Sequence, residues 1–287
     1  MKFFELSCSH GASLTCYILD ERPIRNQNRT PRPGIIIVPG GGYHRLVDHE
    51  QECVAVQFVS KGYHTFILNY SVNEDGKKPL SSIPLEQLAS AVALLRKSSK
   101  EWDLDPECIA VVGFSAGGHL AGSLAVHWDK EWLFRRTGLS SELIKPNALI
   151  LAYPVIVGSG SSLPHRKNSI DYLLGDDASE EERYTYSLEK HVGRHVAPVF
   201  LWHTIEDECA PVEASMLFAN ACICAKVPLE LHIFPKNQHG LSLASKETAW
   251  NDNSEDAHIA HWLMLCDEWL NIIWKEKNIN GKVIDRR

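Results

Sequence analysis

Ser115 stands in the stretch Gly113-Phe114-Ser115-Ala116-Gly117, a Gly-x-Ser-x-Gly pattern. Residues 109–114 before it are typical of a buried strand, and residues 116–127 after it are typical of a helix. A serine on such a sharp strand-to-helix turn projects its hydroxyl from the sheet edge, and the two glycines leave room for the crowded backbone. The pattern therefore predicts a nucleophilic serine, with an ordinary glycine-rich turn as the alternative interpretation.

His239 is the predicted base for this serine. A serine hydroxyl is a weak nucleophile unless a histidine takes its proton, and an acidic residue must orient that histidine. In this arrangement the order along the chain is serine, acid, histidine. His239 lies directly after the last predicted strand, 229–234, where an imidazole can reach the serine. His232 lies inside that strand and is less suitable.

Three carboxylates compete for the role of the orienting acid. Glu206, Asp207 and Glu208 are consecutive and follow the predicted strand 199–203. Asp207 lies in the middle of this loop, ahead of the helix predicted at 212–225. We predict Asp207 as the acid, with Glu206 and Glu208 as the competing choices.

A glycine-rich loop, Pro39-Gly40-Gly41-Gly42-Tyr43, follows the predicted strand 35–38. In a hydrolase of this kind, the loop at that position supplies part of the oxyanion hole. The amides of Gly41, Gly42 and Ala116 are the predicted donors, each worth about 3 to 4 kcal/mol. A phosphate-binding loop is disfavoured because no Gly-Lys-Ser/Thr follows. A plain tight turn is the other alternative.

The candidate residues need a scaffold that brings several loops together. Short apolar runs alternate with segments of helical periodicity, which predicts an α/β protein with a doubly wound, mostly parallel sheet. The predicted strands cover residues 35–38, 64–69, 109–114, 148–153, 199–203 and 229–234, and the predicted helices cover 48–61, a segment from about 84, 116–127, 212–225 and 257–274.

Chain length is compatible with a single α/β domain over residues 1–287. Residues 156–195 contain a Gly- and Ser-rich stretch at 158–162, followed by short amphipathic segments that are too small for a domain. We expect this segment to be a cap inserted over the sheet.

The formal net charge is −7, and acidic and basic residues are mixed along the chain. There is no basic face to neutralise phosphates, so nucleic acid is not an expected partner. Glu5 interrupts the region where a secretion signal would be apolar, and no run approaches the length of a membrane-spanning helix. We expect a cytoplasmic protein without membrane association, and a homo-oligomer is left open.

Eight cysteines are scattered through apparent strands and helices, which is typical of buried free thiols. Cys222 and Cys224 are separated by one residue, which is not a usual zinc spacing. His258 and His261 lie one helical turn apart but lack a nearby third ligand. We expect no metal site.

These motifs together resemble the esterase branch of the α/β-hydrolases described as bifunctional acetyl xylan and feruloyl esterases, or carbohydrate-esterase-like proteins. The resemblance covers most of the chain. It implies the α/β-hydrolase fold, a triad of Ser115, Asp207 and His239, and oxyanion donors at Gly41, Gly42 and Ala116. It rests on residues 38–43, 62–72, 113–120 and 153–155 and on the acid and histidine loops.

Two positions depart from the family pattern. Pro39 stands where related lipases have a histidine before the glycines, and Thr204 stands where a glycine usually follows His203. Neither change removes a required catalytic group, but Thr204 puts the shape of the acid loop and of the pocket in question.

The predicted reaction is acyl transfer without a cofactor: His239 takes the Ser115 proton, Ser115 attacks an ester carbonyl, and water releases the acyl-enzyme. The resemblance implies small acyl groups, especially acetyl, on sugars or oligosaccharides. Tyr43 and Tyr153, with Trp202, are the candidates for an aromatic sugar platform, although a single aromatic residue more often packs in a core. The alternatives are a general carboxylesterase or lipase without sugar preference, and a non-catalytic binding protein of the same fold.

Overall fold

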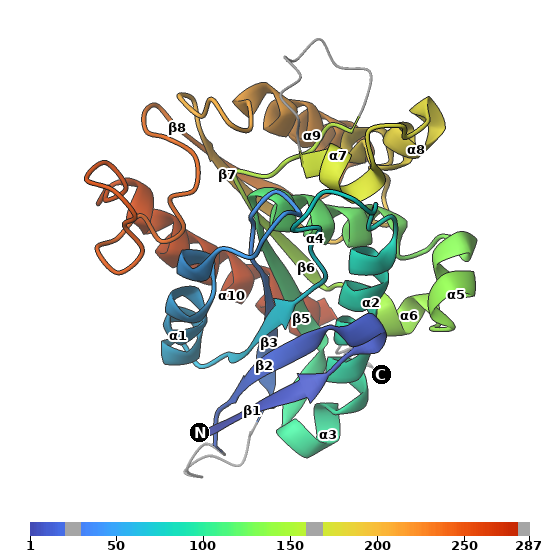
Figure 1. The fold of residues 1–287 in the computed structure, drawn as a ribbon. Coiled ribbons are helices and arrows are strands. Elements are labelled where there is room, and N and C mark those ends of the chain that lie inside the picture. The colour runs from blue at the N-terminus through green and yellow to red at the C-terminus, as the bar shows by residue number, and fades with distance from the viewer. Residues whose placement is uncertain (21–29, 159–168, 281–287) are drawn as a thin grey trace.

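An eight-stranded sheet runs through the molecule in the spatial order β1-β2-β4-β3-β5-β6-β7-β8 (Figure 1). This computed structural model describes residues 1–20, 30–158 and 169–280. Strands β3 to β8 are parallel, and the antiparallel hairpin of β1 and β2 pairs with β4 at one edge. The strands are β1 (Lys2–Ser7), β2 (Ser13–Ile18), β3 (Arg32–Val38), β4 (His64–Asn69), β5 (Leu104–Phe114), β6 (Ala148–Ala152), β7 (Val199–Thr204) and β8 (Leu229–Phe234).

The apolar run at the end of β3 is buried on both faces of the sheet. Successive side chains of a strand point to opposite faces. Ile36 and Val38 accordingly belong to one hydrophobic core, and Ile35 and Ile37 belong to the other. A sheet covered on both sides requires continuous rather than alternating apolar residues, as this strand has.

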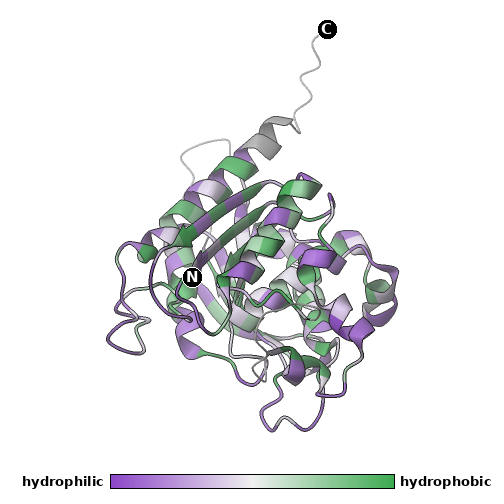
Figure 2. Ribbon diagram, turned by 90° about the horizontal axis from the view of Figure 1, so that it is seen from above, coloured by the Kyte–Doolittle hydropathy of each residue, from purple (hydrophilic) through white to green (hydrophobic). Residues whose placement is uncertain are grey.

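Helices cover the two faces. Phe58 of α1 and Trp262 of α10 lie in one core, whereas Leu88 of α2, Leu120 of α4 and Phe218 of α9 lie in the other. Figure 2 shows the strands coloured largely as hydrophobic and the outer loops largely as hydrophilic. The α-helices are α1 (Glu52–Ser60), α2 (Ile83–Lys97), α3 (Ser99–Trp102), α4 (Ser115–His127), α5 (Glu131–Thr137), α6 (Ser141–Ile144), α7 (Ser169–Leu174), α8 (Glu180–Thr185), α9 (Val212–Ala225) and α10 (Trp262–Asn280), and the 3-10 helices are η1 (Ser9–Gly11), η2 (Asp48–Glu50), η3 (Leu188–Lys190) and η4 (Ile259–His261).

Several predicted elements have the expected bounds, among them β4, β8 and α9. The helix predicted over 48–61 is instead divided into η2 and α1, because the backbone at Gln51 (φ −112°, ψ −105°) is not helical. The helix predicted over 257–274 begins with η4 and continues as α10 to Asn280. The hairpin of β1 and β2 lies outside the predicted strands; β1 is an exposed edge strand that lacks a buried apolar run.

The described part of segment 156–195 contains α7, α8 and η3, and residues 159–168 lie outside the described residues. Ile170, Leu173 and Leu188 are buried in the same core as α2 and α4. In Figure 1, α7 and α8 are drawn above α4. The function of this segment as a cap, and the assignment of 1–287 to one domain, stay predictions.

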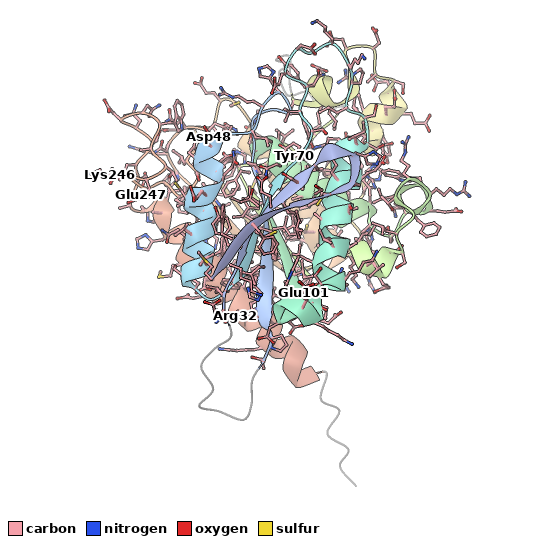
Figure 3. All side chains as sticks on the ribbon, turned by 60° about the horizontal axis from the view of Figure 1, so that its bottom comes forward. Arg32, Asp48, Tyr70, Glu101, Lys246 and Glu247 are labelled. Atoms are coloured by element: carbon pink, nitrogen blue, oxygen red, sulfur yellow. The ribbon has the colours of Figure 1, made fainter. Side chains whose placement is uncertain are left out.

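The loops after the parallel strands meet at one end of the sheet, because parallel strands all point the same way. Figure 3 marks both ends of β3, with Arg32 where the strand begins and Asp48 beyond the opposite end. Tyr70, directly after β4, is labelled near the same end as Asp48. This end of the sheet receives the loops that carry every predicted catalytic residue.

Candidate active site

Ser115 occupies a tight turn between β5 and α4. The strand ends at Phe114 and the helix begins at the serine itself, whose φ is +51°. This left-handed conformation is costly for a residue with a side chain and is common at functional sites. The glycine at 117 is required by close approach, because a Cβ there would lie 2.1 Å from the carbonyl oxygen of Val38 and 2.4 Å from that of Pro39.

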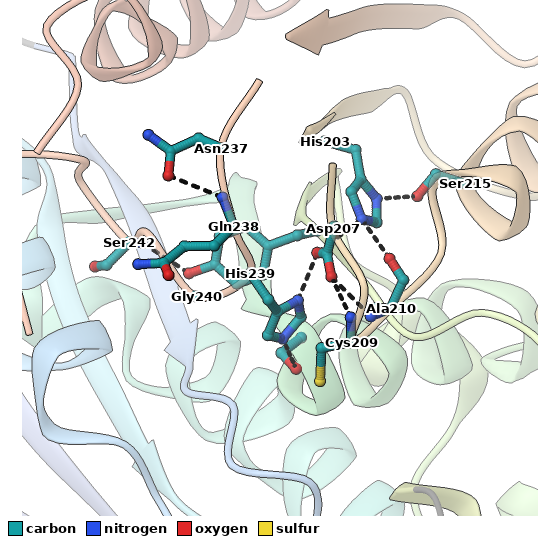
Figure 4. A network of polar contacts seen from close by, with 12 residues as sticks. His203, Asp207, Cys209, Ala210, Ser215, Asn237, Gln238, His239, Gly240 and Ser242 are labelled. Atoms are coloured by element: carbon teal, nitrogen blue, oxygen red, sulfur yellow. Dashed lines mark hydrogen bonds and ion pairs between the residues drawn. The ribbon is translucent and has the colours of Figure 1, made fainter. Parts of the chain in front are cut away.

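His239 joins the serine to the acid. Its Nε2 lies 2.8 Å from Ser115 Oγ. Its Nδ1 lies 2.6 Å from Asp207 Oδ2 (Figure 4). Because an ionised carboxylate only accepts hydrogen bonds, Nδ1 donates to Asp207 and Nε2 is left to accept the serine proton. The loop after β8 thus brings the imidazole to the end of β5.

Asp207 is buried and accepts hydrogen bonds at both oxygens. Oδ1 accepts from the amides of Cys209 and Ala210, each at 2.8 Å. Oδ2 is shared by His239 and by His203 Nε2, which lies 3.1 Å away. Burial alone would raise the pKa of Asp207, but the hydrogen bonds from His203 and His239 outweigh it and hold this pKa well below its usual range. The carboxylate is therefore ionised at neutral pH.

The two competing carboxylates are not the partners of the imidazole, because Asp207 and Ser115 engage its two nitrogens. Glu206 is exposed and accepts a hydrogen bond from the amide of Asn237 at 2.9 Å, which links the acid loop to the histidine loop. Glu208 is also exposed. Of the three consecutive acids, Asp207 is the one that the structure places against His239.

His203 supports the acid and was not predicted to do so. It is fully buried at the end of β7, where Nε2 also contacts the carbonyl oxygen of Ala210 at 2.8 Å and Nδ1 contacts Ser215 Oγ at 2.8 Å. The imidazole thereby ties the start of α9 to the acid loop. Its sequence signal is its position four residues before Asp207 at a strand end.

The glycine loop lies against the serine. A Cβ on Gly40 would be 2.9 Å from Ser115 Cβ, and Gly41 and Gly42 have φ values of +122° and +67°. Within the part of the chain that the structure describes, the amides of Gly41, Gly42 and Ala116 donate no hydrogen bond. These three amides are available donors beside Ser115, and their role as an oxyanion hole stays a prediction.

The expected aromatic platform requires correction. Tyr43 and Tyr153 are 0% and 1% exposed, and Trp202 is fully buried as well. The Tyr43 hydroxyl lies 2.8 Å from His119 Nδ1, whereas the Tyr153 ring packs edge-on against His239, with ring centroids 5.0 Å apart. Tyr43 and Tyr153 lie in the loops after β3 and β6 with their rings turned inward, and Trp202 lies within β7, so none of the three offers a surface to a sugar.

Glu50 is a second residue of the site without a role predicted from the sequence. It is only 2% exposed, and its carboxylate accepts from the Gly40 amide at 2.6 Å and from the Tyr153 hydroxyl at 2.7 Å. Its sequence signal is weak, because a glutamate near the start of a predicted helix is usually solvated.

Among the residues that the structure describes, no group of three His, Cys, Asp or Glu side chains is arranged to hold a metal ion. Within the same ranges, no helix has the length and apolar character needed to cross a membrane. Four of the eight cysteines are buried, but Cys209 and Cys224 are exposed, which corrects the expectation of buried thiols at these two positions.

The sequence model of the BD-FAE family matches residues 23–222. The chain is 38% identical over 218 residues to endo-1,4-beta-xylanase B of Butyrivibrio fibrisolvens, covering 75% of this chain and 33% of that protein. It is 26% identical over 245 residues to an acetylxylan esterase of Xylanibacter ruminicola, covering 84% of this chain and 46% of that protein. The chain thus spans between a third and a half of the length of these two relatives.

Solved structures are similar over almost the whole chain. The acetyl ester-xyloside bifunctional hydrolase of Caldicellulosiruptor lactoaceticus is 35% identical, with a TM-score of 0.76 and coverage of 92% of this chain and 89% of that one. The carboxylesterase Cest-2923 of Lactobacillus plantarum is 26% identical, with a TM-score of 0.83 and coverage of 95% and 98%.

Proposed function

Because the chain belongs to the BD-FAE family and has the α/β-hydrolase fold, we propose that it is a serine esterase that works through an acyl-enzyme on Ser115. The observation that carries this proposal is the pair of hydrogen bonds made by His239, at 2.8 Å to Ser115 Oγ and 2.6 Å to Asp207 Oδ2. This series of contacts is what a serine needs in order to lose its proton while it attacks.

Acylation uses each of these groups in turn. Ser115 Oγ attacks the ester carbonyl carbon as His239 Nε2 accepts the hydroxyl proton. Asp207 holds the imidazole in the required tautomer and stabilises the positive charge that forms on it. The amides of Gly41, Gly42 and Ala116 meet the oxygen that becomes negative.

The same groups complete the cycle. The imidazolium of His239 gives its proton to the departing alcohol, and the acyl group stays on Ser115. A water molecule then attacks the acyl carbon as His239 Nε2 accepts a proton from it. The imidazolium returns this proton to Ser115 Oγ as the acid is released, which restores the free serine.

For the substrate, we propose a small acyl ester, above all acetyl, carried by a sugar or a short oligosaccharide. The names of two similar proteins, an acetylxylan esterase and an acetyl ester-xyloside bifunctional hydrolase, support this choice.

Trp250 is the aromatic side chain that we propose in place of Tyr43 and Tyr153 for the sugar. It is 53% exposed, and its indole Nε1 donates to the carbonyl oxygen of Gly240 at 3.1 Å. Gly240 directly follows His239, so a fixed and half-exposed indole borders the histidine loop. Such a ring offers an apolar face to a sugar while its polar edge is held by the protein.

A carboxylesterase without sugar preference is the second candidate. The burial of Tyr43 and Tyr153 favours it, because these rings do not reach a substrate. The similarity to the carboxylesterase Cest-2923 agrees with it as well. The two candidates share the chemistry at Ser115 and differ in what holds the alcohol part.

The test combines a covalent probe with a substrate panel. Wild type should react with a fluorophosphonate, Ser115→Ala should not, and Ser123→Ala should react normally, because Ser123 is buried in the same helix and bonded to the carbonyl oxygen of His119. Labelling that persists in Ser115→Ala would reject this nucleophile. Hydrolysis of p-nitrophenyl acetate with none of acetylated xylo-oligosaccharides would favour the general carboxylesterase.

A further inference from the structure

Glu50 is a buried carboxylate that contacts two of the loops around the reaction centre. Its two oxygens accept hydrogen bonds from different partners, Gly40 and Tyr153. A carboxylate is rarely buried unless it is paired or hydrogen-bonded, because water solvates its charge strongly. The position of Glu50 therefore suggests a task that an apolar side chain cannot perform.

One contact fixes the loop that carries the predicted oxyanion donors. The peptide unit between Pro39 and Gly40 is held on both sides, since Tyr70 Oη donates to the Pro39 carbonyl at 2.7 Å and Glu50 Oε2 accepts from the Gly40 amide at 2.6 Å. The next carbonyl, that of Gly40, accepts from the Val47 amide at 3.2 Å. Because the N–H and C=O of a trans peptide point in opposite directions, this contact turns the Gly41 amide away from Val47.

The carboxylate also lies close to the nucleophile. A Cβ on Gly40 would be 2.8 Å from Glu50 Oε2 and 2.9 Å from Ser115 Cβ. The single residue Gly40 thus separates the buried carboxylate from the serine. Glu50 therefore contacts the glycine loop at the point where that loop faces Ser115.

The other contact fixes the histidine. Tyr153 Oη donates to Glu50 Oε1 at 2.7 Å and accepts from the Ser242 amide, three residues after His239, at 2.8 Å. The Tyr153 ring also packs against the His239 imidazole. Burial, together with the neighbouring Glu50, raises the pKa of Tyr153 well above its usual value, so the phenol keeps its proton and remains a donor.

We propose that Glu50 is a positioning residue that sets the oxyanion loop and the histidine loop relative to each other, through Gly40 on one side and Tyr153 on the other. This inference rests on the proposed esterase function. Glu50 need not touch the substrate. It acts by keeping the amides of the glycine loop and the His239 imidazole correctly placed relative to each other in the transition state.

The decisive variant is Glu50→Gln, which keeps the shape of the side chain. Its amide oxygen can still accept from Gly40, but its NH2 group then faces Tyr153 Oη, which can no longer donate to it. Displacement of a catalytic group by about 1 Å can cost about 100-fold in rate. We expect kcat for p-nitrophenyl acetate to fall about 10- to 100-fold, with KM changed by less than about 3-fold.

A second measurement separates positioning from general destabilisation. A trifluoromethyl ketone forms a tetrahedral adduct with Ser115 that places a negative oxygen in the predicted oxyanion hole. Its affinity should fall in Glu50→Gln by a factor close to the loss in kcat, because both depend on the same alignment. A merely structural role would lower the melting temperature and leave this affinity unchanged.

Tyr153→Phe tests the contact from Glu50 through Tyr153 to the histidine loop. It removes the hydrogen bonds to Glu50 and Ser242 but leaves the contact between Glu50 and Gly40, so the loss in kcat should be smaller than that of Glu50→Gln. Combining the two substitutions should add little to Glu50→Gln alone, because both interrupt the same chain of contacts. If Glu50→Gln does not fold, Tyr153→Phe carries the test, with an expected loss in kcat of about 3- to 10-fold.

Glu86→Gln is the matched control. Glu86 is a buried carboxylate, 5% exposed, whose Oε1 accepts from Ser82 Oγ at 2.7 Å at the start of α2. Its substitution should lower stability without changing kcat. Equal kcat losses in Glu50→Gln and Glu86→Gln, or an unchanged kcat in Glu50→Gln, would reject the positioning role and leave the esterase proposal standing. A wild type that neither hydrolyses p-nitrophenyl acetate nor reacts with a fluorophosphonate would reject the esterase proposal itself and the positioning role with it.

Discussion

His239 Nε2 lies 2.8 Å from Ser115 Oγ, although 124 residues separate the two in the chain. The serine follows β5 and the histidine follows β8, with β6 and β7 between these strands in the sheet. Three strand spacings amount to about 14 Å. The histidine loop therefore has to reach back across two strands, and the contacts that fix this loop decide whether the proposed base meets the proposed nucleophile.

Asp207→Asn should inactivate the protein and change its stability in acid. The amide disturbs the tautomer of His239, so kcat should fall about 10⁴-fold.

The pKa of Asp207 is held below the value of about 3.9 of an unfolded aspartate. The stabilisation from this carboxylate is therefore complete above pH 4 and is lost as the pH falls towards the depressed pKa. Urea unfolding at several pH values below 4 should show a shallower decline for Asp207→Asn, and equal slopes would contradict the expectation.

His119→Gln should remove part of the pH dependence of folding in a higher range. Burial lowers the pKa of His119 to about 4, as it does for His64 and His127. An unfolded histidine titrates near 6.5, so stability is complete above about pH 6.5 and declines as the pH falls towards 4. Each such histidine contributes about 1.4 kcal/mol per pH unit to this slope. Between pH 4.5 and 6.5, the free energy of unfolding should decline less steeply with falling pH in His119→Gln than in wild type. A variant of the exposed His261 should show the same decline as wild type.

Gly117→Ala should be far more damaging than Gly122→Ala, although both lie in α4. The methyl group at 117 would meet the backbone carbonyls of Val38 and Pro39, which cannot move without shifting β3. At 122 it would meet Leu188 Cδ1 at 2.6 Å, the end of a side chain that can turn away. We expect a loss of about 3 kcal/mol or more for Gly117→Ala and of about 1 kcal/mol or less for Gly122→Ala, measured by urea unfolding. Similar losses would argue against the close backbone approach.

Trp250→Ala should affect sugar esters selectively. If the indole supports the sugar, KM for an acetylated xylo-oligosaccharide should rise about 10-fold, which corresponds to about 1.4 kcal/mol. The kinetics with p-nitrophenyl acetate should stay within about 2-fold, because this ester has no sugar. Phe134→Ala serves as the control, since Phe134 is a comparably exposed aromatic residue on α5. Equal effects of Trp250→Ala on both substrates would reject the sugar platform.

Local sequence patterns were sufficient to predict the fold class and the family resemblance. Both are confirmed by the family match and the similar structures. The turn at Ser115 and the buried strands depend on neighbouring residues, so the sequence displays them directly. The inward turn of Tyr43 and Tyr153 depends on loops from different strands, and no local pattern reports it. The same holds for Glu50, whose partners lie 10 and 103 residues away.

The backbone of α4 touches the glycine loop at Gly117, where even a methyl group would overlap the carbonyl oxygens of Val38 and Pro39. The main chain that follows Ser115 and the main chain at the start of the glycine loop are therefore in direct contact at this point. Dipoles that are fixed before the substrate arrives need no reorganisation as charge develops. Under the proposed mechanism, the amides of the glycine loop and of Ala116 would meet the substrate oxygen already in place.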